Sequence, residues 1–550
     1  MDTQRLILIL IFCFSTFMLI QAWQRESRGP GSPPVEGEVA KSKSSTDATP
    51  KPTVKLELPT APGSLTPTQG KAKVSDLVHV TTDVLAVDID TVGATIVRAE
   101  LLRHRATEDT TKNFVLLGPK HSYSAQSGLI GEGLPNHHSR FEAAAQKYTL
   151  RDGENRLEVR LEAHGSGGIV VRKTLIFERS SYLVTIRQEI QNSNSRVVEP
   201  YGYYQLVRDD KPPEGTSRMV PSFTGAAIYD HKDKYKKVSF EDIAKGKTPY
   251  SKSAEDGWIG IVQHYFLGAW VVPQKVMREF FTKRLADNLY AVGLIIPFNK
   301  VEPGASVTQS VELYLGPQDQ NKLRSIAEGL DLTVDYGWLT VIAVPIFWVL
   351  KTIHAGVGNW GVAIILLTVL IKSLFYPLSA ASYRSMAKMR VLAPKLQRLK
   401  EQYGSDRQRM QQAMMELYKT EKINPLGGCL PIVVQIPVFI SLYWVLLASF
   451  ELRHAPFIFW IHDLAAKDPY YILPILMGAS MIIQSRLNPE PPDPVQAKVM
   501  KIMPIAFSIF FFFFPAGLVL YWLVNNILSI AQQWHITRGL ERAGIAHGKR

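Results

Sequence analysis

Residues 361–377 read GVAIILLTVLIKSLFYP, an almost unbroken apolar run that contains one charged residue, Lys372. Thr368 precedes Lys372 by four residues, so in a helix the hydroxyl and the ammonium share one face, a turn apart. A charged side chain at mid-bilayer costs roughly 2.5–3.5 kcal/mol on insertion scales, and such residues usually serve a function. A lysine near the end of a span can instead extend its charge to the interface. The run alone leaves both interpretations open.

The composition indicates more than one folded unit. The chain has 550 residues, too many for a single hydrophobic core. Its net charge of +13 is compatible with nucleic acid, with anionic lipid, or with basic cytoplasmic loops of a membrane protein. The two cysteines, Cys13 and Cys429, match neither a disulfide framework nor a zinc site. No motif indicates a cofactor or a metal.

The N-terminal part predicts an anchor followed by a tether. Residues 1–22 contain the apolar run 6–20, and the sequence after it is a poor cleavage site, so we expect a retained transmembrane anchor. Residues 23–55 are rich in Pro, Gly, Ser, Thr and Lys. Such a composition cannot bury enough surface to fold, which predicts a flexible linker.

Residues 56–322 alternate apolar and polar side chains, as in VTQSVELYL at 307–315. This period of two, interrupted by glycine, proline and asparagine, predicts a large all-β sandwich. No G-x-S-x-G or H-E-x-x-H motif is present. The sequence does not exclude a sugar- or peptide-binding cleft in this domain. Residues 323–337 change to helical spacing and predict an amphipathic helix on the membrane surface, with docking on the sandwich as the alternative.

Residues 338–550 predict a helical membrane core. The segment 338–353 is apolar but is broken by Pro345, and we expect it to continue into the interface and to lead to the span that carries Lys372. Further apolar runs of near-spanning length follow, which together with the N-terminal anchor make six spans. These runs are 358–378, 425–449, 469–486, 500–514 and 517–534.

The loop 379–424 carries ten basic and four acidic residues, which places it and both termini in the cytoplasm and the β domain in the periplasm. Its apolar residues recur at helical spacing, and Ser405 with Gln408 fits a capping box, so we expect a cytoplasmic helical hairpin. The basic side of the hairpin consists of Arg384, Lys388, Lys395 and Arg398. A topology signal without further function is the alternative.

Several predicted spans carry polar side chains besides Lys372. Gln435 lies between two prolines, and Tyr521 and Trp522 lie in the last span. In lipid such groups turn inward or face water. Together they predict a hydrated recess, open to the cytoplasm, that attracts an acidic or polar segment and shortens its path through hydrocarbon.

Five blocks of the C-terminal part carry a family resemblance. They are YRSMAKMRVLAPKLQRLKEQYG (383–404), NPLGGCLPIVVQIPVF (424–439), ELRHAPFIFWIHDL (451–464), DPYYILPILMGASM (468–481) and FPAGLVLYWLVNN (514–526). Over about 336–550 the chain resembles the YidC membrane protein insertases, relatives of the mitochondrial oxidase-assembly and chloroplast albino insertases. Its whole layout is similar to the Gram-negative form, with a periplasmic β-supersandwich between the first span and five further spans.

The resemblance implies a hydrophilic groove closed to the periplasm and open to cytoplasm and lipid. The single cation of that groove falls on Lys372, where the family usually has arginine, so the charge is kept but the bidentate fork is lost. The groove hydroxyl falls on Thr368 and the amide on Gln435. A family tyrosine falls on Trp522, beside Tyr521. The hairpin matches a region implicated in early substrate capture.

The expected function is therefore that of an inner-membrane insertase and chaperone, not an enzyme. It would insert and help fold nascent membrane proteins from the ribosome, alone or with the Sec translocon and its accessory subunits, in the lipid bilayer and without reading a specific nucleic acid sequence. A membrane assembly scaffold without insertase activity and a secondary transporter are the alternatives, although no repeated halves are visible. A membrane-anchored carbohydrate-active enzyme would leave five further spans without a purpose.

Overall fold

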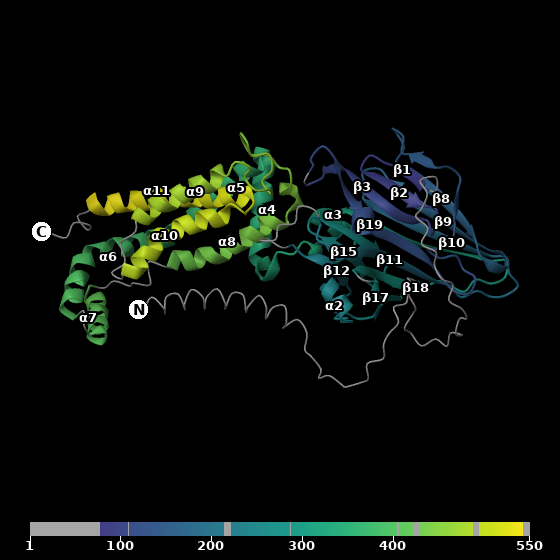
Figure 1. The fold of residues 1–550 in the computed structure, drawn as a ribbon, viewed down its shortest axis with the longest axis horizontal. Coiled ribbons are helices and arrows are strands. Elements are labelled where there is room, and N and C mark those ends of the chain that lie inside the picture. Colours follow the sequence, from purple (N-terminus) through teal and green to yellow (C-terminus); the bar gives the residue numbers. More distant parts are fainter. Residues whose placement is uncertain are drawn as a thin grey trace. The chain divides into compact units, whose positions relative to one another are not determined.

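The computed structural model describes residues 77–107, 109–213, 222–286, 288–403, 406–421, 430–487 and 494–542. The predicted anchor 1–22 and linker 23–55 lie outside these residues. The described chain separates into two compact units that meet in sequence at Val334 and Asp335 (Figure 1). We call them the β unit and the helical unit.

The β unit consists of two large sheets, and several of their strands are labelled in Figure 1. The first has the order β14 (Ser253–Ala254), β17 (Arg278–Ala286), β18 (Leu289–Pro297), β11 (Tyr201–Asp209), β5 (Ser124–Ile130), β3 (Thr95–Arg105), β2 (Leu85–Asp90), β1 (Leu77–Thr81) and β7 (Lys147–Thr149), with β4 (Asn113–Leu117) beside β3. The second has the order β13 (Lys236–Ser239), β12 (Thr224–Tyr229), β15 (Trp258–Gln263), β16 (Phe266–Val271), β19 (Ser306–Pro317), β10 (Leu183–Asn192), β9 (Ile169–Glu178), β8 (Arg156–His164) and β6 (Glu142–Ala143).

The alternation of side chains explains this architecture. In β10, every second residue is buried, and the strand pairs in antiparallel register with β9 and β19. Val184 and Ile190 are fully buried, while the residues between them are partly exposed. Such a period of two leaves one face for the core and one for solvent. The predicted all-β sandwich is confirmed.

The predicted continuous helix over 323–337 is wrong. The chain instead forms a short helix α3 (Gln320–Ile326) and a 3₁₀ turn η4 (Leu330–Thr333). Gly329 adopts φ +72° between them, and a Cβ there would lie 2.4 Å from the Tyr229 ring, so only glycine fits this close approach. Leu323 and Leu330 are fully buried. The segment docks on the β unit, which was the alternative.

Arg278 joins two loops of the β unit, the one before β15 and the one before β17. Its side chain is 1% exposed and donates five hydrogen bonds of 2.6 to 3.2 Å to backbone carbonyls. The acceptors are the carbonyls of Val276, Gly257, Val272, Glu255 and Pro273. A guanidinium has five N–H donors, so every one of them is used.

The segment that ends the β unit is fastened by a cluster around His231. Its Nδ1 lies 2.6 Å from Asp256 Oδ2, and its Nε2 lies 2.8 Å from Glu328 Oε2. Glu328 also accepts a hydrogen bond from the Tyr229 hydroxyl at 2.9 Å. The hydrogen bond with Asp256 and the charges of both carboxylates raise the pKa of His231 above its usual value. Glu328 lies directly before Gly329, so the cluster ties the α3–η4 segment to the sheet.

The helical unit follows. Its helices within the described residues are α4 (Thr340–Val357), α5 (Trp360–Leu374), α6 (Tyr376–Tyr403), α7 (Arg407–Thr420), α8 (Leu430–Ala448), α9 (Ile472–Leu487), α10 (Pro494–Phe511) and α11 (Ala516–Arg542). α11 packs against α5 and α9, and α4 packs against α5 and α8.

The predicted interruption at Pro345 is wrong, because α4 continues through that residue. A proline removes only one backbone hydrogen bond of a helix that has many. By length and composition, Gly337–Val357 is the one helix among the described residues that could span a membrane. A second is obtained if α5 and Tyr376–Ala387, which meet at 65°, form one bent span. The interfacial placement of 338–353 and the six spans remain predictions.

The predicted hairpin contains α6 and α7, which contact each other (Figure 1). Asp406, not Ser405, caps α7, because its carboxylate accepts from the backbone N–H groups of Gln408 and Arg409. Ser405 itself lies outside the described residues. Lys395 pairs with Glu421 at 2.6 Å. Arg384 and Arg398 are exposed, and the side chain of Lys388 lies outside the described residues.

Replacing Arg278 by lysine keeps the charge but offers three N–H donors for five carbonyls. We expect the β unit to lose about 2–4 kcal/mol of stability, because at least two buried carbonyls lose their partner. Hydrogen exchange of β15 and β17 in the detergent-solubilised full chain, with increasing denaturant, measures this loss. Arg160→Lys, at an exposed ion pair on β8, is the matched control and should change little. Equal exchange in the two variants would contradict the role of Arg278.

The His231 cluster predicts a pH dependence. A pKa raised on folding stabilises the folded state fully below the unfolded value of about 6.5, and this stabilisation disappears as the pH rises through the raised pKa. Hydrogen exchange of residues 323–334 should therefore accelerate with pH more steeply in the natural chain than in His231→Asn. His79→Asn, which removes an exposed histidine paired with Asp88, should keep the steeper dependence. Identical pH profiles for the natural chain and His231→Asn would refute this clamp.

Candidate functional site: a polar pocket in the helical unit

A pocket of about 300 Å³ lies among α5, α6, α8, α9 and α11. Its wall is mixed, with aromatic and aliphatic side chains between polar ones. The polar lining residues with amide, hydroxyl or ammonium groups are Lys372, Ser379, Tyr383, Gln435, Gln484, Asn525, Asn526 and Ser529. Segments up to 157 residues apart in the sequence thus bring their polar groups to one place.

Helix α5 places Lys372 in this pocket. Asn359 caps the helix, its side-chain oxygen accepting from the Val362 N–H at 3.0 Å. Gly361 allows the close packing of α5, because a Cβ at this position would lie 2.1 Å from the Phe457 ring. Pro377 follows the helix and lacks a backbone N–H, which accounts for the change of direction between α5 and α6.

Lys372 is buried, and its ammonium has a neutral partner. The residue is 9% exposed, and Nζ donates a hydrogen bond of 2.8 Å to Ser529 Oγ. Among the described residues no carboxylate lies beside it. An ammonium has three N–H donors, so one is used by this contact.

A second buried lysine, Lys173 of β9, shows how the same chain satisfies an ammonium that is only structural. Lys173 is 1% exposed, and its Nζ donates to the carbonyls of Gly93 at 2.7 Å and Ser127 at 3.0 Å. It also lies 4.9 Å from the centre of the Phe141 ring. Burial lowers the pKa of Lys173 to about 7. Lys372, with one partner beside a pocket, is satisfied less completely.

The other predicted groove residues are placed unequally. Gln435 and Trp522 line the pocket, whereas Thr368 and Tyr521 are 1% exposed and are not among its lining residues. The Thr368 hydroxyl donates to the Ile364 carbonyl at 2.6 Å, so it is satisfied within its own helix. Gln435 Nε2 donates to the Tyr521 hydroxyl at 2.7 Å. Tyr521 therefore acts on the pocket through Gln435.

Two buried polar atoms at the pocket have no hydrogen-bond partner among the described residues. They are the indole N–H of Trp522, a donor, and Oδ1 of Asn525, an acceptor. A buried polar group without a partner costs about 1–3 kcal/mol. Less than 1 Å² of either atom is accessible, so in this structure neither atom is offered to a guest in the pocket.

Ser529 is a pocket residue that the sequence reasoning did not select. It lies eight residues after Tyr521, with Asn525 halfway between them, and this spacing of four puts the three residues near one helix face. That spacing is the feature of the sequence from which Ser529 could have been identified as a pocket residue. Serine alone is common in helices, so its presence indicated nothing.

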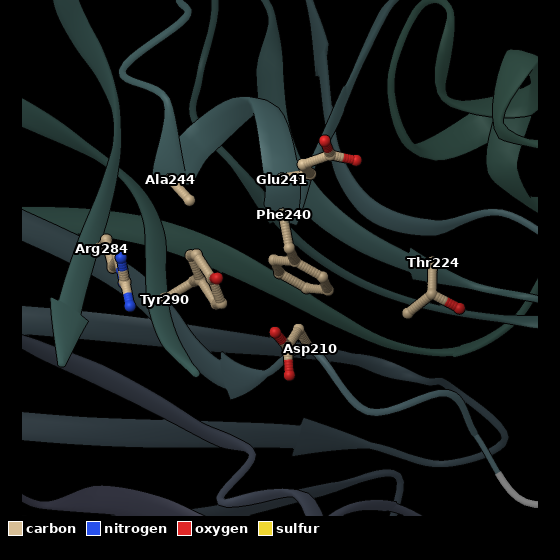
Figure 2. Close-up of a pocket in the computed structure, with 7 residues that line it drawn as sticks. All are labelled: Asp210, Thr224, Phe240, Glu241, Ala244, Arg284 and Tyr290. Atoms are coloured by element: carbon tan, nitrogen blue, oxygen red, sulfur yellow. The ribbon is translucent and has the colours of Figure 1, made fainter. Parts of the chain in front are cut away.

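A second pocket, of about 470 Å³, lies in the β unit and is drawn in Figure 2. In this view Asp210 and Glu241 lie on opposite sides of Phe240. Phe240 and Tyr290 pack against each other with ring centroids 5.0 Å apart and are nearly buried, so no open aromatic face is offered. Glu241 pairs with Lys245. This surface therefore gives little support to the sugar- or peptide-binding cleft left open above.

Comparisons with known proteins agree along the whole chain. The sequence profile of the YidC periplasmic domain matches residues 77–349, and that of the 60Kd inner membrane protein family matches residues 352–543. The Membrane protein insertase YidC of Methylobacillus flagellatus is 56% identical, with 99% of this chain and 98% of that protein covered. The Membrane protein insertase YidC of Dechloromonas aromatica is 52% identical, with 99% of each covered.

A solved structure described as an active YidC insertase with the first transmembrane domain resolved shares 17% identity with this chain. It covers 84% of this chain and 92% of its own, with a TM-score of 0.39. The two profiles and the near full-length relatives establish the family by themselves. The chain belongs to the YidC family of membrane protein insertases.

Proposed function

We propose that the helical unit inserts nascent membrane proteins into the inner membrane by receiving an acidic extramembrane segment in the pocket at Lys372. The observation that carries this proposal is the ammonium itself. It is buried, its partner is a neutral hydroxyl, and it faces a polar pocket. The names of the relatives, which are insertases, support the same function.

The electrostatic step is a transient ion pair. Two opposite unit charges at about 4 Å attract by about 4 kcal/mol at an effective dielectric constant of about 20. This attraction offsets part of the cost of taking a carboxylate out of water.

The driving force is the burial of the apolar part of the substrate. An apolar segment gains about 25 cal/mol for each Å² removed from water, so partition into the bilayer completes the insertion. The pocket lowers the barrier for the polar end and makes no covalent bond. The chain therefore acts as an insertase and not as an enzyme.

The remaining parts of the chain take complementary roles in this proposal. The basic hairpin α6–α7 meets the nascent chain at the ribosome, and the Sec translocon with its accessory subunits is a second partner. The six-span topology, with both termini in the cytoplasm and the β unit in the periplasm, orients the pocket toward the cytoplasm. Thr368 supports α5 from within the helix.

The charge of Lys372 can be tested directly. In liposomes that contain only the purified chain, Lys372→Gln and Lys372→Glu should lower the insertion of a small single-span protein with an acidic tail at least about tenfold, since a tenfold change corresponds to 1.4 kcal/mol of the interaction above. Protease protection of the tail measures insertion. Lys351→Gln, which removes a lysine of α4 away from the pocket, is the matched control. Normal insertion by both Lys372 variants would remove the charge from the mechanism.

The same assay separates insertion from the alternatives. A scaffold without insertase activity would bind the substrate in detergent but leave its tail accessible to protease in liposomes. A secondary transporter would move a small solute and show no dependence on the substrate protein. Insertion by the purified natural chain excludes the scaffold.

The hairpin offers a further test. Among the described residues no acidic side chain pairs with Arg384 or Arg398, whereas Lys395 is compensated by Glu421. Arg384→Gln and Arg398→Gln should therefore slow the capture of ribosome-bound chains more than Lys395→Gln does. The loss should shrink as salt increases, because exposed charges are screened over about 10 Å at 0.1 M. Equal effects of the three variants, independent of salt, would argue against electrostatic capture.

A further inference from the structure

Ser529 of α11 touches the ammonium on which the proposed function depends. It is 4% exposed and comes from a helix separated from Lys372 by more than 140 residues of sequence. We infer that Ser529 is a positioning residue, which holds the Lys372 ammonium inside the pocket and prevents it from turning toward the interface. This inference rests on the proposed function, because it assigns a part to the same site.

The direction of the hydrogen bond follows from the contacts of the hydroxyl. Ser529 Oγ donates its one proton to the Asn525 carbonyl at 2.7 Å. Its lone pairs then remain for the Lys372 N–H, which lies 2.8 Å away. The hydroxyl is therefore fixed as an acceptor by its own helix. Because the hydroxyl does not rotate, its lone pairs keep a fixed direction toward the cation.

The hydrogen bond to Ser529 holds the Lys372 side chain in the pocket, whereas without it the side chain could extend to the interface. A lysine has a flexible four-carbon stem, and near the end of a span its charge can move toward water. Lys372 lies about 9 Å from the end of the predicted span 358–378, so the interface is within reach of the stem. The free energy of one hydrogen bond to a charged group is large enough to determine whether the ammonium lies in the pocket or at the interface.

The same contact leaves the ammonium able to bind substrate. One N–H is used by Ser529, and two remain for a carboxylate that enters the pocket. If an acidic residue replaced Ser529, it would pair with the ammonium and compete with the substrate. A neutral acceptor therefore positions the charge without neutralising it.

Two measurements on the full chain in liposomes test this inference. The first is the rate at which a water-soluble amine reagent modifies Lys372, relative to Lys351 in the same molecule, by mass spectrometry. The second is the insertion of a single-span protein with two aspartates in its tail, compared with the same protein carrying asparagines. The variants are Ser529→Ala, Ser529→Thr and Lys372→Gln, together with the double variant of Ser529→Ala and Lys372→Gln.

We expect Ser529→Ala to increase the modification of Lys372 and to lower insertion of the acidic-tailed protein about tenfold, the order expected for one hydrogen bond to a charged group. Insertion of the asparagine-tailed protein should not change. Ser529→Thr should behave as the natural chain because it keeps the hydroxyl. In the Lys372→Gln background, Ser529→Ala should have no further effect, because the group that it positions is absent.

The outcomes separate this inference from the proposed function. If Lys372→Gln lowers insertion but Ser529→Ala changes neither measurement, the positioning role is wrong and the proposed function stands. If Ser529→Ala increases modification but no variant changes insertion, the positioning stands and the charge mechanism fails. Equal losses from Ser529→Ala in both backgrounds, or for both tails, would show a merely structural role and overturn the inference.

Discussion

The helical unit buries a positive charge, Lys372, that no carboxylate among the described residues neutralises. A buried ammonium with a carboxylate partner would be stable but inert, and one without any partner would be too costly to hold. Lys372 lies between these limits, with one hydroxyl acceptor and a polar pocket beside it. The mixed lining of α8 and α11 follows from this constraint, because a fully apolar wall would expel the charge and an acidic wall would cancel it.

The β unit solves its own electrostatic problems in the opposite way. Arg278 uses all five N–H groups on backbone carbonyls, and Lys173 has two carbonyls and a ring. These cations are closed off, and they hold loops and strands together. Among the described residues, the hydrogen bonding of Lys372 is thus less complete than that of Arg278 or Lys173.

Much of the architecture could be predicted because it rests on periodicity. Alternation along strands such as β10 predicted the sandwich, and the hairpin helices followed from helical spacing. Features that depend on contacts between particular side chains could not be predicted as well from the sequence. Gly329 breaks the expected helix because of a tertiary contact with Tyr229, and Asp406 rather than its neighbour caps α7. Pro345 stays within a helix because the helix around it is long enough to tolerate it.

The site was predicted where a residue type is rare in its surroundings. A lysine, a glutamine and a tryptophan in apolar runs are informative, and Lys372, Gln435 and Trp522 meet at the pocket. Thr368 shares the face of Lys372, yet its hydroxyl bonds to its own backbone, which spacing alone does not show. Ser529 was missed for the converse reason, since a common residue becomes important only through a partner distant in sequence.

The bend between α5 and α6 has a mechanical consequence. α6 has 28 residues, about 42 Å at 1.5 Å per residue, and its first two turns supply Ser379 and Tyr383 to the pocket. If α6 rotates as one rigid body about Phe375, the residues at the pocket, which are near Phe375, move less than the residues at the hairpin. A displacement of about 4 Å at the far end becomes about 0.6 Å at Ser379 and about 1.1 Å at Tyr383, in the ratio of their distances from Phe375 along the helix. A movement of the hairpin on binding a partner would thereby change the width of the pocket by a much smaller distance.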